Sequence, residues 1–459
     1  MKKLLLTICA CAIIGTGIAQ DLKKATLYVP GFDATTMDGM YGTIYGVSAN
    51  GEYAAGYDDF IGSCCFIWKR STGEFEVVDL GSMIMDASND GTFVGNYWVE
   101  IPGSDGLTAS RPGYYKDGVW KPLPILRAEA MLTSGTGEAD DINGCAISIS
   151  ADAKFIGGYI TDEFIYKLYP ALWQWNEETQ SYDLIDTFES VQESIDKLDC
   201  PFGWVVKGMS DDGTIITGFS EWGSGARSSA VIINGVEKRL TCLQDPLEAY
   251  LETGINQHLD AEGYAQVSAN GQYFAGYYAA SANLTDLCGW SWTADQESVT
   301  FLDPYSVTTC VDNNGIIYGS DGPMGQAALY NNGKKTLLSS LYAWNEPAGA
   351  NLSTIFATSN DGGVLGGIAM VGFSMGSIQI PAVLVTDGTE GVNTVKGETN
   401  SVVMAGGWAF INGEYNNARV YNIQGVLVAE ATEGNIDLNN VPAGIYVVNV
   451  DGQSFKVVK

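Results

Sequence analysis

Aromatic and acidic residues collect just after the short, glycine-ended strand patterns of this 459-residue chain, and they are its residues best suited to chemistry. Flat rings stack on the C–H faces of sugars, and carboxylates accept hydrogen bonds from hydroxyl and amide groups. The pattern therefore predicts a site for a glycan, a peptide or a host surface molecule. The candidate ligand-binding residues are Tyr57, Asp58, Asp59, Tyr97, Trp98, Glu100, Asp162, Glu163, Tyr166, Glu221, Trp222 and Tyr278.

Packing is the alternative role for aromatic residues that directly follow a strand-ending glycine. A side chain at this position can pack against the neighbouring repeat instead of binding a ligand. The position is held by Tyr57, Tyr159, Phe219 and Tyr277. Trp98 and Trp222 lie further into the loops, where binding and packing are equally compatible with the sequence.

An extracellular polysaccharide-degrading enzyme is a second interpretation of the same acids. Glycosidases place two carboxyl groups about 5–10 Å apart, one acting as acid and the other as base or nucleophile. The sequence fixes no such separation and contains no catalytic motif, so we assign no catalytic residue. A structural surface component is a third interpretation.

Metal and thiol chemistry find little support in the sequence. His258 is the single histidine, so any histidine-based metal site or Ser-His-Asp triad would need it. The Asp-Asp-Gly turns lack the acidic ladder and distal Glu of a calcium loop, so we predict no cofactor, with calcium as the alternative. After an expected leader, seven cysteines without Cys-x-x-Cys spacing remain, and we expect most to be buried: Cys64, Cys65, Cys145, Cys200, Cys242, Cys288 and Cys310.

A repeated motif explains where the candidate residues lie. Each copy is a strand-like run, a Ser or Asp, an Asx-Gly turn and a second strand that ends in Gly. Asn-Gly and Asp-Gly between strand-like runs indicate hairpins, because these residues tolerate positive φ. Ala153 replaces the turn glycine in the third copy, so we expect a less regular turn there. The copies span residues 45–57, 86–97, 147–159, 207–219, 264–278, 309–320 and 356–367.

A second apolar hairpin follows each copy, so each unit consists of four short strands. Such a sheet cannot cover its own faces, and stacked sheets of this kind form propeller blades. The sequence predicts an all-β fold, a seven-bladed β-propeller over residues 21–390 with six or eight blades as alternatives. The last unit has only a weak fourth strand in residues 389–397, so we expect residues 24–32 to pair there and close the ring.

Long and variable connections lie on one face of the predicted ring. Binding is commonly carried by variable loops on a rigid frame, and the longest connections bias the predicted site toward blades two to five. These connections are residues 96–113, 124–143, 186–204, 241–262 and 277–289.

The repeats resemble the extracellular HAF repeats, whose units read Ile-Asn-x-x-Gly-x-x-x-Gly followed by an aromatic strand. The resemblance covers residues 44–388, although the family's histidine is absent from every copy. It implies a propeller-like shell and no defined activity.

The tail, residues 391–459, carries a different pattern of alternating strands and glycine turns that predicts a small antiparallel β-sandwich. It resembles the C-terminal type A sorting domain of the bacterial type IX secretion system. The resemblance implies that the tail is recognised by the secretion machinery. Its motif positions are Tyr421, Gly425, Gly444, Tyr446, Lys456 and Lys459.

Residues 1–20 read as an export signal, with two lysines before an apolar run and Gly-Ile-Ala near its end. We therefore expect a secreted or surface-attached protein. The formal net charge of −31 disfavours nucleic-acid binding, because the surface would repel phosphate backbones. No later stretch reaches the roughly 18 apolar residues of a spanning helix, so we predict no transmembrane segment.

Overall fold

The computed structural model describes the chain in segments, and it divides into two compact units, Met1–Asp387 and Gly388–Lys459. Helix in the described part is confined to residues 191–192 and the 3-10 helices η1 (Leu338–Ser340) and η2 (Pro347–Gly349), so the protein is all-β. The described residues are 22–33, 38–58, 64–80, 82–100, 108–125, 144–162, 165–188, 191–192, 203–222, 226–240, 265–279, 287–304, 306–322, 325–345, 347–373, 376–386, 401–405, 408–412, 417–422, 426–431, 436–438, 441–442, 445–450 and 453–458.

Four-stranded antiparallel groups follow one another along the first unit, each in up-and-down order. The outermost strand of sheet 7 is the exception, because it comes from the start of the chain. A single parallel pair, Leu168 opposite Gly203, joins the third and fourth groups into one eight-stranded sheet, and we number these groups separately as sheets 3 and 4. Sheet 1 contains β4 (Thr43–Val47), β5 (Tyr53–Tyr57), β6 (Cys64–Lys69) and β7 (Glu74–Leu80), and sheet 2 contains β8 (Met83–Ala87), β9 (Phe93–Glu100), β10 (Thr108–Lys116) and β11 (Val119–Pro122). Sheet 3 contains β12 (Gly144–Ile149), β13 (Phe155–Asp162), β14 (Ile165–Asn176) and β15 (Ser181–Asp186), and sheet 4 contains β16 (Gly203–Met209), β17 (Ile215–Trp222), β18 (Ala226–Ile233) and β19 (Val236–Arg239). Sheet 5 contains β20 (Gln266–Val267), β21 (Phe274–Ala279), β22 (Leu287–Trp292) and β23 (Thr300–Pro304), sheet 6 contains β24 (Val307–Val311), β25 (Ile317–Ser320), β26 (Ala327–Asn331) and β27 (Lys334–Leu337), and sheet 7 contains β29 (Ala350–Thr358), β30 (Val364–Phe373), β31 (Gly376–Thr386) and β1 (Lys23–Tyr28).

The first strands of these sheets form a closed cycle. Each of β4, β8, β12, β16, β20 and β24 contacts the first strand of the following sheet, and β29 contacts β4 again. Sheets that meet through their first strands around a closed cycle make a β-propeller, with those strands around a central channel. Outside this pattern, the hairpin β2 (Phe32–Asp33) and β3 (Asp38–Gly39) follows β1, and β28 (Tyr342–Ala343) pairs in parallel with β1.

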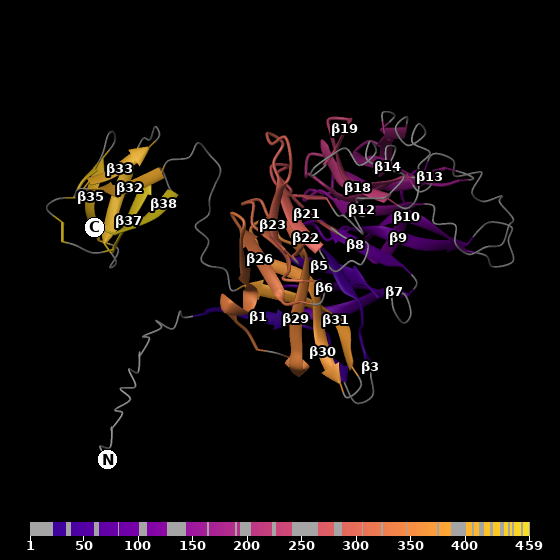
Figure 1. Ribbon diagram of the computed structural model, residues 1–459, viewed down its shortest axis with the longest axis horizontal. Coiled ribbons are helices and arrows are strands. Elements are labelled where there is room, and N and C mark those ends of the chain that lie inside the picture. The colour runs from indigo at the N-terminus through magenta and orange to yellow at the C-terminus, as the bar shows by residue number, and fades with distance from the viewer. Residues whose placement is uncertain are drawn as a thin grey trace, which may run out of the picture. The chain divides into compact units, whose positions relative to one another are not determined.

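The ring closes with strands from opposite ends of the unit, as the sequence predicted. β1 pairs with β31 in antiparallel register from Ala25 opposite Thr386 to Tyr28 opposite Val383. The indigo β1 lies next to the orange strands that end the unit (Figure 1). Leu27 from β1 is 2% exposed and packs into the core of sheets 6 and 7. The weak strand at residues 389–397 lies outside the described residues.

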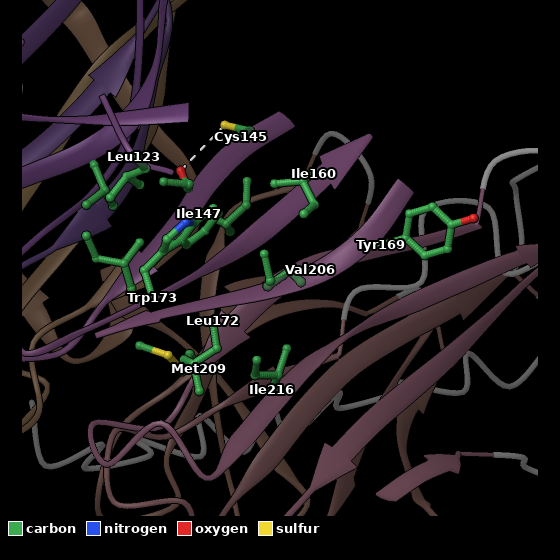
Figure 2. Packing of buried hydrophobic residues seen from close by; sticks show 14 of the residues in the cluster. Leu123, Cys145, Ile147, Ile160, Tyr169, Leu172, Trp173, Val206, Met209 and Ile216 are labelled. Atoms are coloured by element: carbon green, nitrogen blue, oxygen red, sulfur yellow. Dashed lines mark hydrogen bonds between the residues drawn. The ribbon is translucent and has the colours of Figure 1, made fainter. Parts of the chain in front are cut away.

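Apolar side chains fill the space between neighbouring sheets. The largest cluster joins sheets 2, 3 and 4, with Trp173 fully buried among Ile147, Val206 and Met209 (Figure 2). The Trp173 indole donates to Pro124 O at 2.8 Å, so the buried ring keeps a hydrogen bond. Packing between blades therefore supplies the apolar burial that one four-stranded sheet lacks.

The repeated Ser-x-Asx-Gly sequence forms one conserved turn geometry. Ser48 Oγ donates to Asn50 Oδ1 at 2.8 Å and accepts the Tyr53 N–H at 2.9 Å, while the Gly51 N–H bonds to Ser48 O at 2.8 Å. The buried serine hydroxyl thus bonds to both sides of the turn, and we call this set of bonds the serine bracket. The same pattern recurs at Ser88, Ser150, Ser210, Ser268 and Ser359, all of them buried.

The expected irregularity at Ala153 was wrong. Ala153 adopts φ of 57°, and its N–H bonds to Ser150 O at 2.9 Å, as the turn glycines do in the other copies. The bracket formed by Ser150 is strong enough to hold an L residue in the left-handed region, which costs about 1–2 kcal/mol relative to glycine.

The second unit contains two antiparallel sheets with a common core. One holds β32 (Ser401–Ala405), β33 (Trp408–Asn412) and β36 (Ile436–Asp437); the other holds β34 (Ala418–Asn422), β35 (Leu427–Ala431), β37 (Ile445–Val450) and β38 (Gln453–Val458). Val420, Ile436 and Val448 lie in its core. Among the described residues of the chain, no helix is long and apolar enough to cross a membrane.

Candidate binding site

One end of the channel is encircled by hydrogen bonds between the repeated turns. Each turn bonds to the next around the whole cycle, and the last bonds back to the first through the Asn360 N–H and Ala49 O at 3.0 Å. Asx side chains supply several of these acceptors. The other links are Asn50 N to Asn89 Oδ1, Asn89 N to Ala151 O, Ala151 N to Asp211 Oδ1, Asp211 N to Ala269 O, Asn270 N to Asn313 Oδ1, and Asn313 N to Asn360 O.

Inside this ring lies a small polar cavity of about 120 Å³, to which every sheet contributes residues of its first strand or turn. Asp86, Lys207 and Asp211 are the charged residues among its described lining, with Gln266 and Asn360 among the polar ones. Its volume suits a few water molecules better than a drug-sized ligand, which needs about 300 Å³ or more.

Asp86 is the most perturbed carboxyl of the channel. Burial raises its pKa to about 7, although hydrogen bonds to the charged form oppose the shift. Its Oδ2 accepts from the Ile149 N–H at 3.0 Å and from Ser148 Oγ at 3.2 Å, and its Oδ1 accepts from the Ala87 N–H at 2.8 Å. Oδ2 therefore joins sheet 2 to sheet 3, while Oδ1 is held within sheet 2, and both roles are structural. Asp86 was not among the sequence candidates; it is the only Asp or Glu at the second position before the turn Ser or Asp in any copy, and this signal could have found it.

Aromatic residues and one lysine surround the part of the channel above the turns. Tyr45 stacks on Tyr57 with centroids 4.8 Å apart and contacts Phe356 of sheet 7 at 6.0 Å. In sheet 4 the Lys207 ammonium lies over the Phe219 ring at 5.7 Å from its centroid. The contacts of Tyr57 with Tyr45 and of Phe219 with Lys207 each lie within one sheet, whereas the alternative role was packing against the neighbouring repeat; of the two residues, Tyr57 also packs against the apolar cluster that joins sheets 1 and 2.

Sheets 2, 3 and 4 extend beyond the ring as long second and third strands. β9, β13 and β17 continue four or five residues past the strand-ending glycines Gly95, Gly158 and Gly218. We call the part of the β9–β10 hairpin formed by residues 96–100 and 108–112 the rim hairpin. These extensions place candidate positions on one end of the ring, opposite the bonded turns, because second strands run away from the first turn.

The rim hairpin presents the clearest binding surface among the candidate residues. Trp98 is 41% exposed, and Glu100, two residues along the same face of β9, is also exposed. On the opposite face, Tyr97 stacks flat on Trp120 at 5.3 Å with 7° between the rings. Burial raises the pKa of Tyr97, and the nearby Arg111 guanidinium opposes that shift.

Two buried polar atoms of the rim hairpin make no hydrogen bond within the described part of the chain. They are Ser110 Oγ, whose residue pairs with Trp98, and Arg111 Nε, whose residue pairs with Tyr97. Buried polar atoms are nearly always paired in folded proteins. The rim hairpin therefore differs from the bonded turns, where each serine bracket is satisfied internally.

The remaining candidates fall into three groups: one buried residue, residues of which only the backbone is described, and residues outside the described part of the chain. Asp58 is 5% exposed and directly follows the end of β5. Asp162, Tyr166, Glu221, Trp222 and Tyr278 lie on strands near the hairpin ends, and only their backbone is described. Asp59 and Glu163 lie outside the described residues, as do Gly425, Gly444 and Lys459 of the tail. Tyr421 lies in β34 and Lys456 in β38, and the buried Tyr446 donates from its hydroxyl to Pro442 O at 2.6 Å.

The described residues contain no group of three His, Cys, Asp or Glu side chains able to hold a metal ion. Cys65, Cys145 and Cys310 are buried, and Cys64 and Cys288 are half-buried. Burial raises the pKa of Cys145 to about 12, which keeps that thiol protonated and inert. Cys200, Cys242 and His258 lie outside the described residues.

No protein-family model and no curated protein matches the sequence. Similar solved structures include TolB from Acinetobacter baumannii, with 10% identity, a TM-score of 0.34 and coverage of 74% of this chain and 81% of that chain. An oligogalacturonate lyase in complex with manganese has 8% identity and a TM-score of 0.40, and the polysaccharide lyase Uly1 has 12% and 0.43, each covering 80% of this chain and 98% of its own. No functional statement follows from similarities this low.

Proposed function

We propose that this protein is a secreted or surface-held binding protein, a seven-bladed β-propeller of the HAF-repeat type that binds an extracellular glycan through its rim hairpins. The observation that carries the proposal is the pair formed by the exposed Trp98 indole and the exposed Glu100 on one face of β9. An indole offers a flat surface to a sugar ring, and a carboxylate beside it accepts sugar hydroxyls. A peptide or a host surface molecule is the alternative ligand.

A glycan array probed with residues 21–387, together with a pull-down from extracellular extracts, tests this proposal. We expect Trp98→Ala to weaken binding to any array hit about tenfold, since an aromatic stacking contact is worth roughly 1–2 kcal/mol. Phe301→Ala is the matched control, because Phe301 is also a partly exposed aromatic residue (37%) but lies on β23 of another sheet. No binding in either assay, or equal losses of affinity in Trp98→Ala and Phe301→Ala, would refute glycan binding at the rim hairpin.

We further propose that the second unit is a β-sandwich sorting domain recognised by the type IX secretion machinery. Support comes from the motif positions of the tail and from the two antiparallel sheets that share a core separate from the propeller. Deleting residues 388–459 should leave a folded propeller in the periplasm, because the expected N-terminal export signal is retained. Normal amounts of the truncated protein at the surface or in the medium would overturn this proposal.

A further inference from the structure

The side of the rim hairpin opposite Trp98 carries an arginine that has no acidic partner. Arg111 of β10 lies directly across from Tyr97 of β9, and residues that oppose each other in this way point to the same side of the sheet. We call the side formed by Tyr97, Val99 and Arg111 the arginine face. Within the described part of the chain, Arg111 makes no ion pair and no side-chain hydrogen bond.

An unpaired arginine is unusual in this chain, because acids outnumber bases by 54 to 23. Lys69 pairs with Glu76 at 2.9 Å and Lys116 pairs with Asp90 at 2.7 Å. Arg111 Nε is buried, and a buried polar group without a hydrogen bond is costly. The terminal nitrogens of this guanidinium are not buried, so an acid from outside the chain could reach them.

Aromatic packing fixes the shape of the arginine face. The Tyr97 ring lies flat on the Trp120 ring at 5.3 Å, and Tyr115 meets Trp120 edge-on at 5.6 Å. Gly113, two residues after Arg111 on the same strand, makes room for this arrangement, because a Cβ there would meet Tyr97 Cε1 at 2.6 Å. The rings beside the guanidinium are therefore packed before a ligand arrives.

Hydrogen-bond donors predominate on the arginine face. The guanidinium offers five N–H groups, the Tyr97 hydroxyl offers one more, and the buried Trp120 Nε1 is a donor without a partner within the described residues. Burial raises the pKa of Tyr97, and the Arg111 charge opposes that shift, so the guanidinium lies close to the phenol. No Asp or Glu belongs to the described residues of this face, whereas Glu100 lies on the opposite one.

We propose that the arginine face binds the carboxylate of an acidic sugar, with the Arg111 guanidinium as its partner and the Tyr97 hydroxyl beside it. A planar guanidinium matches a planar carboxylate through two parallel hydrogen bonds. The inference rests on the proposed function for the glycan nature of the ligand, and it adds the charge of that ligand. A single acidic sugar suits this face better than a polyanion, because the net charge of −31 repels repeated negative charge.

Ligand-observed NMR on residues 21–459 tests the proposal with three probes: methyl glucuronide, its uncharged methyl ester, and glucose 6-sulfate. We expect the glucuronide to bind about tenfold more tightly than the ester, which is the difference between a charged and a neutral hydrogen bond. The sulfate should bind more weakly than the glucuronide, because it does not match the planar guanidinium. Equal binding of glucuronide and ester, tighter binding of the sulfate, or no binding of any probe would overturn the proposal.

Variants of Arg111 locate the carboxylate. Arg111→Gln should abolish the preference for glucuronide over ester, and Arg111→Lys should retain only part of it, because an ammonium lacks the planar fork. Arg70→Gln is the matched control, since it removes the same charge at an exposed position between β6 and β7 of sheet 1 and should leave the preference intact. A preference that survives Arg111→Gln would refute the proposed contact.

The glycan array separates a failure of this inference from a failure of the proposed function. We expect acidic glycans among the hits, weakened by both Trp98→Ala and Arg111→Gln. Neutral hits that are weakened by Trp98→Ala and unaffected by Arg111→Gln would leave the proposed function standing and refute the acidic ligand. An array without hits would count against both.

Chemical labelling of the wild type guards against misfolding of the Arg111 variants. Phenylglyoxal modifies guanidinium groups, and peptide mass spectrometry resolves Arg111 from the exposed Arg70. The glucuronide should slow modification of Arg111 several-fold and leave the rate at Arg70 unchanged, whereas the methyl ester should protect Arg111 much less. An unchanged rate at Arg111, or equal slowing at both arginines, would refute the proposed site.

Discussion

The bonded turns and the rim hairpin are opposite ends of the same sheets, and they differ in how their polar groups are used. At the turn end, buried serines, Asx side chains and main-chain groups bond to one another around the ring. At the rim, Trp98 is exposed, Ser110 Oγ and Arg111 Nε are unpaired among the described residues, and the strands differ in length between sheets. The repeated residues thus stabilise the propeller, and we call these hydrogen-bonded turns and the strands that they join the frame. Residues that differ between copies lie at the rim, where a ligand could bind.

The largest expected effect tests whether the frame includes Asp86. Its pKa is about 7 in the folded protein against an ordinary 3.8, so the native state holds a proton that the unfolded chain releases above pH 4. Its contribution to the free energy of unfolding should therefore fall as pH rises from about 4 to 7 and stay constant above. At about 1.4 kcal/mol per pKa unit, the loss is on the order of 4 kcal/mol.

Urea unfolding of the wild type and Asp86→Asn at several pH values measures this contribution. The difference between the two profiles should slope downward between pH 4 and 7, because the variant has no proton to release. Asp117→Asn, at an exposed turn, should parallel the wild type. Parallel profiles for Asp86→Asn would show that the channel carboxyl is not perturbed.

A somewhat smaller effect is expected from removing one serine bracket. Ser268→Ala loses the bond to Asn270 Oδ1 at 2.7 Å and leaves the Tyr273 N–H without its 3.0 Å acceptor. We expect a loss of about 2 kcal/mol in the free energy of unfolding, because an unpaired buried group adds to the lost bond. Ser71→Ala, at an exposed turn of sheet 1, should change it by less than about 0.5 kcal/mol. A similarly small loss for Ser268→Ala would contradict the conclusion that the serine hydroxyl stabilises the turn.

A substitution in the rim hairpin should change ligand affinity rather than the free energy of unfolding. Trp98→Ala is expected to lower ligand affinity while changing the free energy of unfolding by about 1 kcal/mol or less, because the side chain is 41% exposed and its removal opens no enclosed cavity in the core. Thermal unfolding of the same samples used for binding provides the comparison. A large stability loss would make Trp98 a packing residue and remove the contrast between the two ends.

The smallest effect concerns the exceptional turn of sheet 3. Ala153→Gly should raise the free energy of unfolding by about 0.5 kcal/mol, because relief of left-handed strain exceeds the added entropy of the unfolded glycine. Gly213→Ala in the matching turn of sheet 4 should lower it, since its φ is +70° and a Cβ would meet the Phe155 ring at 3.0 Å. Both are measurable by urea unfolding. Stabilisation by Gly213→Ala would mean that the turn geometry is not under this constraint.

Much of the frame was predictable because it is local and repeated. The Asx-Gly hairpins and the use of residues 24–32 to close the ring follow from strand patterns and turn chemistry alone. The links between turns were not predictable, because most join residues about forty to sixty positions apart, the closing one joins Asn360 to Ala49, and the side chains look like ordinary turn residues. Asp86 was missed for the same reason: its partners, Ser148 and Ile149, come from the next sheet.

The candidate site was predicted less well, because residue type does not show exposure. The sequence places Tyr57 directly after a strand-ending glycine and Trp98 further along, but it left binding and packing open at both positions. In the structure Tyr57 stacks on Tyr45, while Trp98 is exposed. The difference arises from strand length: β5 ends at Tyr57, whereas β9 continues to Glu100 and carries its tryptophan past the packed ring.

The position of β31 has a mechanical consequence. The last strand of the propeller is β31, which pairs with β30 over residues 376–385 and with β1 over its last four residues, 383–386. At its last residue, the Thr386 N–H and hydroxyl both donate to Gly363 O at 3.1 Å. A pull on the following residues would therefore load two antiparallel ladders at once rather than unzip an edge strand. A protein tethered through its C-terminal segment in flowing fluid would resist tension at the point where its ring is joined.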